Sequence, residues 1–138
     1  MPDKATLERA KKDKRAGKAP STQAGEFVRE EIEHIREGKH GARSAKQAIA
    51  IGLSKARRAG VDLPPPKKGA TSEQTRRSAA SAYRAGQEGD HTVSPARSRA
   101  TTRALKREGQ AAASKQALSR HAHAAAADKT AADRSAAV

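Results

Sequence analysis

Large apolar residues gather in the first half of the chain, where they recur at the spacing of a helix. Val28, Ile32 and Ile35 lie four and then three positions apart, and Phe27 adjoins the first of them. This spacing places them on one face of an amphipathic helix. The pattern therefore predicts a helix over residues 26–38 whose apolar face packs against another element.

A second amphipathic helix is predicted after a short turn that contains glycine. Ser44 and Gln47 have the spacing of a capping box, which starts this helix at Ala45. Ile49 and Leu53 then follow on one face, four positions apart. Two such helices joined by a short turn can bury their apolar faces against each other, so the sequence predicts a helical hairpin, antiparallel or at an angle.

One glycine lies inside the second predicted helix, and two apolar residues follow that helix. Gly52 costs about 1 kcal/mol relative to alanine within a helix, so it indicates either a close contact between helices or simple tolerance. Val61 and Leu63 are expected to fold back over the hairpin.

Five glycines that follow an arginine by two positions indicate where helices end. Arginine in a last helical turn offsets the negative end of the helix dipole, and glycine just beyond it adopts the left-handed conformation that closes the helix. The glycines are 21, 22, 26 and 23 residues apart, which is the length of one helix plus one loop and predicts about six helical units. They are Gly17, Gly38, Gly60, Gly86 and Gly109.

Capping residues predict where other helices begin. Ser21 or Thr22 is expected to cap the first helix of the hairpin. Ser72 is expected to open a weaker third helix, and Ser94 before Pro95 has the signature of a cap followed by proline at the first helical position.

Composition limits how much of the chain can form a core. Although 35 % of the residues are hydrophobic, 32 of these are alanine and only 16 are larger, and nine of the 16 lie within residues 27–63. One small core is therefore expected in that window and only there, because the other segments bury too little apolar surface to offset chain entropy. The expected fold class is all-α: a small helical hairpin core with additional short helices that are partly disordered or form conditionally.

The chain is expected to have four parts that differ in composition. They are a basic N-terminal arm at 1–20, the helical hairpin core at 21–63, a Pro/Lys linker with a weak helix at 64–93, and a basic, alanine-rich tail, helical or disordered, at 94–138.

Charge points to a polyanionic partner. The formal net charge is +14 and the pI is near 10.8, so the chain should concentrate on nucleic acid. The chain has one phenylalanine and one tyrosine, which leaves little material for stacking on unpaired bases. We therefore expect phosphate contacts with double-stranded DNA and little sequence preference, although structured RNA, such as the ribosome, would use the same electrostatics.

The basic residues expected to contact phosphates follow the hairpin and the segments after it. They are Arg43, Lys46, Lys55, Arg57, Arg58, Lys67, Lys68, Arg76, Arg77, Arg97, Arg99, Arg103, Lys106 and Arg107. Residues 39–60 carry a charge of +6 without an acidic residue, whereas residues 26–38 carry −3. The acidic face of the first helix should not face a phosphate backbone, so it is expected to have a structural role.

A different class of function remains open from sequence alone. The acidic and basic helices at 26–60 could instead dock a protein partner or a second copy of the chain, with the basic tails providing solubility. This alternative predicts that the apolar face of the hairpin, rather than its cations, carries the activity.

Enzyme chemistry is not expected. Sixteen large apolar residues leave little material for the walls of a catalytic pocket, so we expect no catalytic residues and no cofactor. His121 and His123 point in different directions on a helix and are poor metal co-ligands, and His34 and His40 are expected to be solvated or to cap the hairpin turn. The chain has no cysteine, no apolar signal segment and no membrane span, so a cytoplasmic location at the nucleoid is expected and no membrane partner.

A short stretch of sequence in the second half of the chain is similar to one in the first half. REGQAAASKQALS at 107–119 is similar to REGKHGARSAKQAIA at 36–50, with two residues fewer between the glycine and KQA. Alanine-rich composition could also produce it.

The stretch KQAIAIGLSKARRAG resembles a family of small basic bacterial proteins that share a KQAIAIxLSxAR run and a domain without an assigned function. Longer members of that family, some labelled plasmid stabilisation proteins, also resemble this chain at EFVREEIEHIREGKHGARS, AGVDLPPPKKG and SRATTRALKREGQAAASKQALSR, so the resemblance covers most of residues 20–120. It implies at most a role in DNA maintenance and brings no established site residues.

Overall fold

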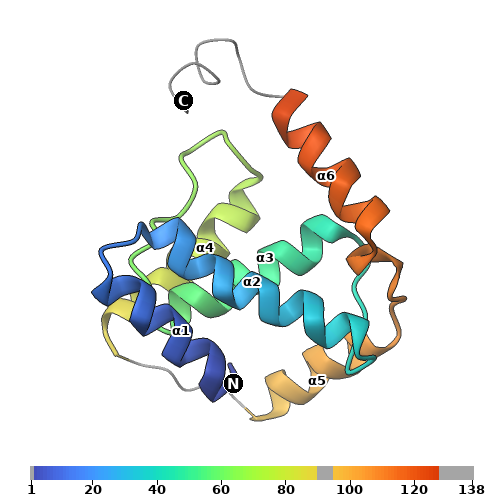
Figure 1. Cartoon of the computed structure of the whole chain (residues 1–138), viewed down its shortest axis with the longest axis horizontal. Coiled ribbons are helices and arrows are strands. Elements are labelled where there is room, and N and C mark those ends of the chain that lie inside the picture. The colour runs from blue at the N-terminus through green and yellow to red at the C-terminus, as the bar shows by residue number, and fades with distance from the viewer. Residues whose placement is uncertain (1, 90–94, 128–138) are drawn as a thin grey trace.

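A computed structural model describes residues 2–89 and 95–127, and these form helices and turns without a β-strand (Figure 1). The prediction of an all-α fold with about six helical units is therefore confirmed for this part of the chain. The elements are α1 (Lys4–Arg15), α2 (Pro20–Arg36), α3 (Ala45–Arg58), α4 (Glu73–Gln87), α5 (Pro95–Lys106), the short 3-10 turn η1 (Ala111–Ala113) and α6 (Lys115–Ala127). None of the described helices combines the length and apolar character of a membrane span.

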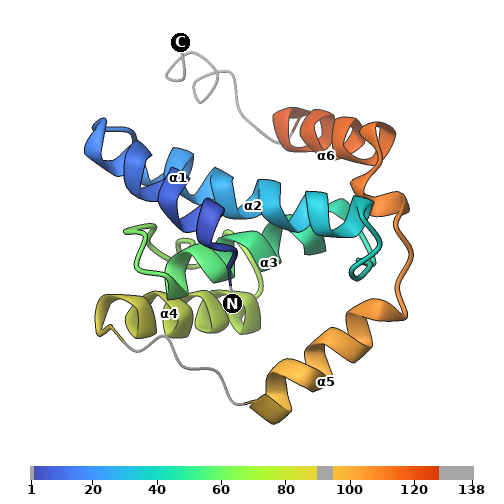
Figure 2. The same ribbon diagram turned by 60° about the horizontal axis from the view of Figure 1, so that its bottom comes forward.

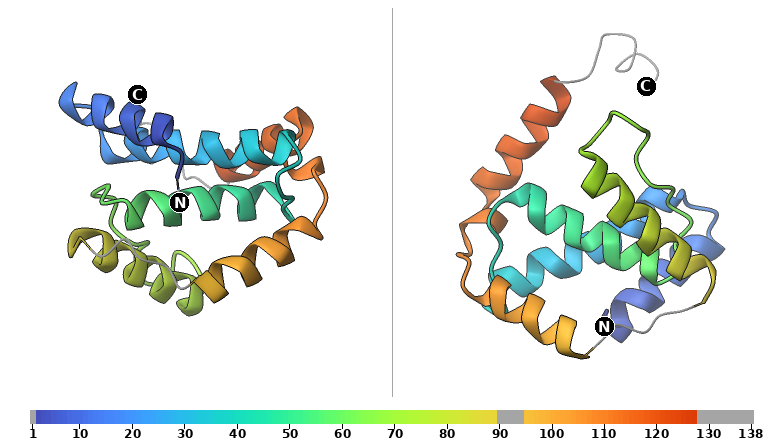
Figure 3. Two further views of the ribbon diagram at one scale, coloured as in Figure 1. Left: turned by 90° about the horizontal axis from the view of Figure 1, so that it is seen from below. Right: turned by 180° about the vertical axis from the view of Figure 1, so that it is seen from behind.

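The predicted hairpin forms the centre of the molecule. Helices α2 and α3 run antiparallel and make the most extensive contact between any two described elements, α1 lies on α2, and α4 lies on the opposite side of α3 (Figures 2 and 3). Gly52 makes the close contact between helices that was one of its two predicted roles, because the Cα of Val28 in α2 lies against its α-carbon. Val61 folds back and is buried with Phe27, as predicted.

The core extends beyond the window of large apolar residues, so the expectation that it lies only within 27–63 is wrong. One buried cluster includes Ala10 of α1 with Phe27, and partly buried Leu7 packs against it. A second cluster joins Ile35 to residues more than seventy positions later; its buried members are Ile35, Ala42, Ala48, Ala112 and Ala113. Alanine lets helix backbones approach closely and still fill the contact, so alanine-rich segments can contribute to a core despite their small apolar area.

Three of the five predicted helix stops are confirmed. Gly17, Gly38 and Gly60 have φ values of 77°, 80° and 99°, each one residue beyond the C-cap of α1, α2 or α3. The predicted stop at Gly86 is wrong, because α4 continues to Gln87 and the left-handed glycine is Gly89, with φ 78°.

Gly86 has a different structural role. It is buried, and a side chain there would place its first carbon 1.8 Å from the carbonyl oxygen of Arg57, so only glycine permits this contact between α4 and the end of α3. Gly109 is also not a left-handed stop, because its φ is not positive.

Two of the predicted helix starts are confirmed and one is wrong. The Ser44 hydroxyl accepts a hydrogen bond from the Gln47 N–H (3.1 Å), and the Ser72 hydroxyl accepts one from the Thr75 N–H (3.3 Å), so both cap their helices. Helix α2 begins at Pro20 rather than after Ser21 or Thr22. Proline is favourable at the first helical position, because an N–H there would make no hydrogen bond within the helix. The predicted cap at Ser94 lies outside the described residues.

The last turn of α5 and the segment after it are joined to the hairpin turn by backbone hydrogen bonds. The Gly41 N–H donates to the Leu105 carbonyl (2.8 Å) and the Ala42 N–H donates to the Gly109 carbonyl (3.0 Å). Nε of Arg36 donates to the carbonyl of Ala113 (3.0 Å). The two segments with similar sequences, 36–50 and 107–119, therefore lie against each other.

Candidate nucleic-acid interface

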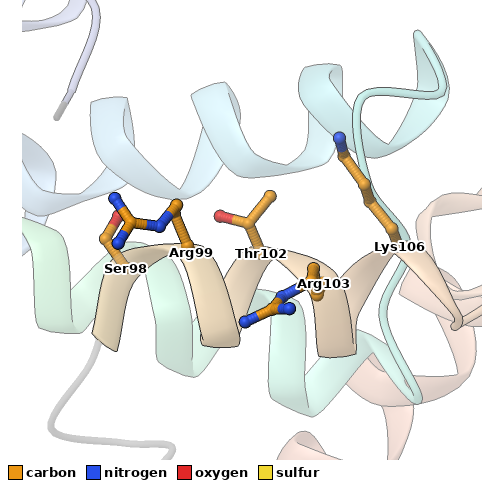
Figure 4. A pocket seen from close by; sticks show the side chains of 5 residues that line it. All are labelled: Ser98, Arg99, Thr102, Arg103 and Lys106. Carbon is orange, nitrogen blue, oxygen red and sulfur yellow. The ribbon is translucent and has the colours of Figure 1, made fainter. Parts of the chain in front are cut away.

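Helix α5 presents an exposed row of cations. It buries none of its residues, and residues 95–107 include no acidic side chain. Arg99, Arg103 and Lys106 lie four and three positions apart, so they share one face of the helix and span roughly 10 Å along its axis. Together with Ser98 and Thr102 they line a shallow surface hollow (Figure 4). We call these five residues the α5 face.

The chemistry of the α5 face matches a phosphate backbone. Guanidinium and ammonium groups bind phosphate oxygens with charge-assisted hydrogen bonds, and serine and threonine hydroxyls are common additional donors to the backbone. Arg97 and Arg107, on and just beyond the same helix, are also exposed. All five cations predicted in this segment thus lie at the surface.

Helix α5 stands apart from the bundle. No other described helix packs against it, and its C-terminal end is fixed by the bond between Gly41 and Leu105. Figure 2 shows it below and to the right of the layers formed by α2, α3 and α4, rising toward the α2–α3 turn. A helix that packs on nothing leaves most of its circumference open to a partner.

A second basic surface lies where α6 meets the start of α3. Arg43, Lys46 and Arg120 line a shallow hollow there with His121, and we call these four residues the α3–α6 corner. The hollow includes Ser44, the N-cap of α3, so the positive end of the α3 dipole adds to the side-chain charges. Arg43 and Lys46 were predicted, whereas Arg120 and His121 were not.

Arg57 was predicted to contact phosphate but is buried. Its side chain turns inward, with Nε donating to the Leu63 carbonyl (3.1 Å) and an NH2 group donating to the Pro64 carbonyl (3.2 Å). Burial lowers the pKa of this guanidinium below its usual value. Arg57 therefore holds the segment that follows α3 against the end of that helix.

Three other predicted cations are engaged with carboxylates. The Lys55 ammonium binds the buried carboxylate of Glu31. Arg76 makes two hydrogen bonds of 2.8 Å to Glu73, and Arg77 lies 3.6 Å from the same carboxylate. The bonds from Arg76 lower the pKa of Glu73 and raise the pKa of Arg76, so the local charge near the start of α4 is partly neutralised.

The remaining predicted cations lie between α3 and α4 or at the end of α3. Lys67 and Lys68 are exposed in the connecting segment, and Arg58 is half-buried in the last turn of α3. The structure thus divides the 14 predicted cations: seven belong to α5 and its end or to the α3–α6 corner, while the others are buried, paired with carboxylates or placed elsewhere.

Two acidic residues in the middle of α2 are buried, while Glu33 stays partly exposed. Glu30 and Glu31 are 2 % and 0 % exposed. Glu30 accepts hydrogen bonds from the backbone N–H of Asp3 and from Thr6, while Glu26 pairs with Arg9 at 2.9 Å. This placement is consistent with the predicted structural role, because Glu26 and Glu30 link α2 to α1 and Glu31 links α2 to α3 through Lys55.

Of the two roles predicted for His34 and His40, solvation is wrong for both, whereas His40 does bond the hairpin turn, with Nδ1 2.8 Å from the Gly41 carbonyl oxygen. Their side chains are 14 % and 11 % exposed, and their rings meet edge to face with centroids 6.2 Å apart. Nε2 of His34 lies 3.1 Å from Oδ2 of Asp3, and this contact lowers the pKa of Asp3; Nε2 of His40 lies 3.1 Å from Glu31. Both imidazoles therefore belong to a partly buried polar cluster.

Comparison with known proteins finds one matching family, and no function has been assigned to that family. Residues 11–68 match a family of unknown function (DUF6496), which is consistent with the resemblance noted for the hairpin sequence. The matched segment covers the C-terminal end of α1, all of α2 and α3, and the chain that follows them. No curated protein and no solved structure is significantly similar to the chain.

Proposed function

We propose that this chain binds double-stranded DNA with little sequence preference and acts in nucleoid organisation or plasmid maintenance. The observation that carries the proposal is α5: a helix with no buried residue, no acidic residue from 95 to 107 and a cationic stripe along one face. Such a helix repels itself and gains little from packing, so a polyanion is the partner that would stabilise it most.

The wider charge distribution supports the same partner. The chain carries +14 overall, and the α3–α6 corner adds a second basic surface near a helix N-terminus. With Phe27 buried and Tyr83 hydrogen-bonded to Asp62, these aromatic rings are not arranged as platforms for unpaired bases. The contacts that remain are those to phosphates, which carry little sequence information.

The alternative of a protein-docking hairpin has less support. The apolar stripe of α3 packs against α2, and α1, α4 and η1 also lie on the hairpin. Leu53 packs against the first core cluster and Ile49 is half-buried. Substitution of these two residues would therefore test folding rather than partner binding.

The experiment is a salt-dependent affinity measurement on the full chain with a duplex DNA. Removal of one phosphate-binding cation should make the slope of log K against log salt about 0.9 less steep. Arg99→Ala, Arg103→Ala and Lys106→Ala together should therefore reduce the slope by about 3. Lys11→Ala, Lys12→Ala and Lys14→Ala together are the matched control, because they remove the same charge from α1.

Two outcomes would contradict the proposal. An affinity that changes little with salt would exclude a phosphate-based mechanism. Equal slopes for the α5 triple variant and the α1 control would exclude α5 as the interface. Two duplexes of unrelated sequence and a duplex RNA competitor, measured in parallel, test the lack of sequence preference and the choice of DNA over RNA.

A further inference from the structure

A cluster of imidazole and carboxylate groups lies where α1, α2 and the α2–α3 turn meet. Glu31, His34 and His40 each place one potential ligand atom within 4.8 Å of those of the other two. Asp3 and Glu30 form an overlapping set that shares His34. Side chains from three separate segments thus converge on one small volume, away from the basic surfaces described above.

The spacing of these atoms matches a small tetrahedral ion. Zn²⁺ holds nitrogen and oxygen ligands at about 2.0–2.1 Å, so neighbouring ligands in a tetrahedral site lie roughly 3.3 Å apart. Nε2 of His40 lies 3.1 Å from Oε2 of Glu31, and Nε2 of His34 lies 3.1 Å from Oδ2 of Asp3. Two ligand-to-ligand distances therefore already have the length that such a site requires.

The hydrogen bond on the far side of the His40 ring fixes which nitrogen could bind a metal. Nδ1 of His40 lies 2.8 Å from the carbonyl oxygen of Gly41. A carbonyl only accepts, so Nδ1 carries the proton. Nε2 then faces Glu31, and this arrangement, with one ring nitrogen donating to a backbone carbonyl, is the usual support for a metal-bound histidine.

Charge balance favours a dication in the cluster. Asp3, Glu30 and Glu31 contribute three carboxylates, whereas Lys55, bound to Oε1 of Glu31, contributes one ammonium. With neutral imidazoles this leaves two negative charges; Glu30 and Glu31 are 2 % and 0 % exposed, whereas the Asp3 side chain is 55 % exposed. Buried charges require compensation, which comes either from a divalent ion or from protonation of both imidazoles.

The excess of negative charge is not balanced by neighbouring groups. Oε2 of Glu30 is buried and has no hydrogen-bond partner among the described residues. Lys39 lies near Asp3, but its ammonium is paired with Glu37 at 3.4 Å. The cluster thus keeps an unpaired carboxylate oxygen in a buried position, where an unpaired polar atom is costly.

We propose that Glu31, His34 and His40 form a structural Zn²⁺ site and that Asp3, which in this structure is grouped with His34 and Glu30 rather than with Glu31 and His40, moves in as the fourth ligand. Two imidazole nitrogens with carboxylate oxygens are ligands that Zn²⁺ accepts in tetrahedral geometry. The ion would tie the start of α1 and the α2–α3 turn to the middle of α2. The proposal concerns the stability of the hairpin and does not depend on DNA binding.

The test is titration of the metal-free full chain with ZnCl2 by calorimetry, and with CoCl2 by visible absorption. One equivalent should bind, the thermal midpoint should rise with metal concentration, and cobalt should give the intense bands of a tetrahedral site. His34→Ala with His40→Ala should weaken binding by at least about 100-fold, since loss of outer-shell partners alone costs about 10–100-fold. His121→Ala with His123→Ala is the matched control and should bind as the wild type does.

A second measurement uses the wild-type chain alone, in case the cluster variant does not fold. Diethyl pyrocarbonate modifies accessible imidazoles, and mass spectrometry identifies which ones. Zn²⁺ should protect His34 and His40 but leave His121 and His123 reactive. Failure to bind Zn²⁺, or protection confined to His121 and His123, would overturn the proposal and leave the cluster as protonated imidazoles paired with carboxylates.

Discussion

A methyl group on Gly52 of α3 would lie 2.6 Å from the Cα of Val28 in α2. This contact between two backbones sets the distance between the helices of the hairpin, because no larger residue fits without a shift of one helix. It also explains why a residue that weakens an isolated helix lies in the middle of α3.

The contact predicts that Gly52→Ala destabilises the protein even though alanine favours helix. Overpacking costs about 1–3 kcal/mol, which exceeds the gain of about 1 kcal/mol in helix propensity. Gly25→Ala is the control, since Gly25 lies in α2 with nothing within 4 Å of an added methyl group, and it should stabilise the protein by up to about 1 kcal/mol. Thermal or urea unfolding followed by far-UV circular dichroism measures both, and equal effects would refute the close contact.

Arg57→Ala should lower stability rather than DNA affinity. The substitution leaves the carbonyls of Leu63 and Pro64 without their donor, and a hydrogen bond from a charged group contributes about 1.5–3 kcal/mol. Lys67→Ala, an exposed cation in the same connecting segment, should leave stability unchanged. If Arg57→Ala keeps the wild-type unfolding midpoint but weakens DNA binding, Arg57 belongs to the interface instead.

Tyr83 should titrate above the usual pKa of a tyrosine. Its hydroxyl donates to Oδ1 of Asp62 (2.6 Å), and this bond, followed by burial and the charge of Asp62, raises the pKa of Tyr83 above 10.0. The neutral phenol is the form that the fold stabilises. Its contribution to stability is therefore fully present below the unfolded-state pKa of about 10 and is lost as pH rises through the higher folded-state value.

The titration can be measured directly, because Tyr83 is the single tyrosine and the chain has no tryptophan. Phenolate absorbance should show a midpoint above 10.0 in the wild type and a lower midpoint in Asp62→Ala. Glu88→Ala removes another acidic side chain near the end of α4 and should keep the wild-type midpoint. A midpoint that does not respond to Asp62→Ala would mean that the bond does not form in solution.

The candidate interface was only partly predictable. The exposure of the cations of α5 could be predicted from sequence. A helix that carries several arginines, no acidic residue and no apolar stripe has no face to bury, so its cations stay at the surface. The burial of Arg57 was not predictable, since its partners are backbone carbonyls whose position depends on how the chain turns after α3. Arg120 was not predicted as part of an interface because its neighbours there are distant in sequence. Arg43 and Lys46, which lie beside it in the α3–α6 corner, are more than seventy residues earlier.

The sequence by itself determined the local features of this protein. The caps at Ser44 and Ser72 and the helix ends before Gly17, Gly38 and Gly60 depend on groups within one turn of the chain, so their chemistry can be recognised from neighbouring letters. The all-α class follows from the same signals.

Only the tertiary structure decided which groups became buried. Asp3 and Glu30 are 27 positions apart and Lys55 and Glu31 are 24 apart, and each glutamate is buried because its partner arrives from another segment. The alanines at 112 and 113 become core in the same way, through Ile35. The burial of a residue depends on all the side chains that pack around it, many of which come from distant parts of the chain. The identity of a small or charged residue does not indicate which side chains these will be.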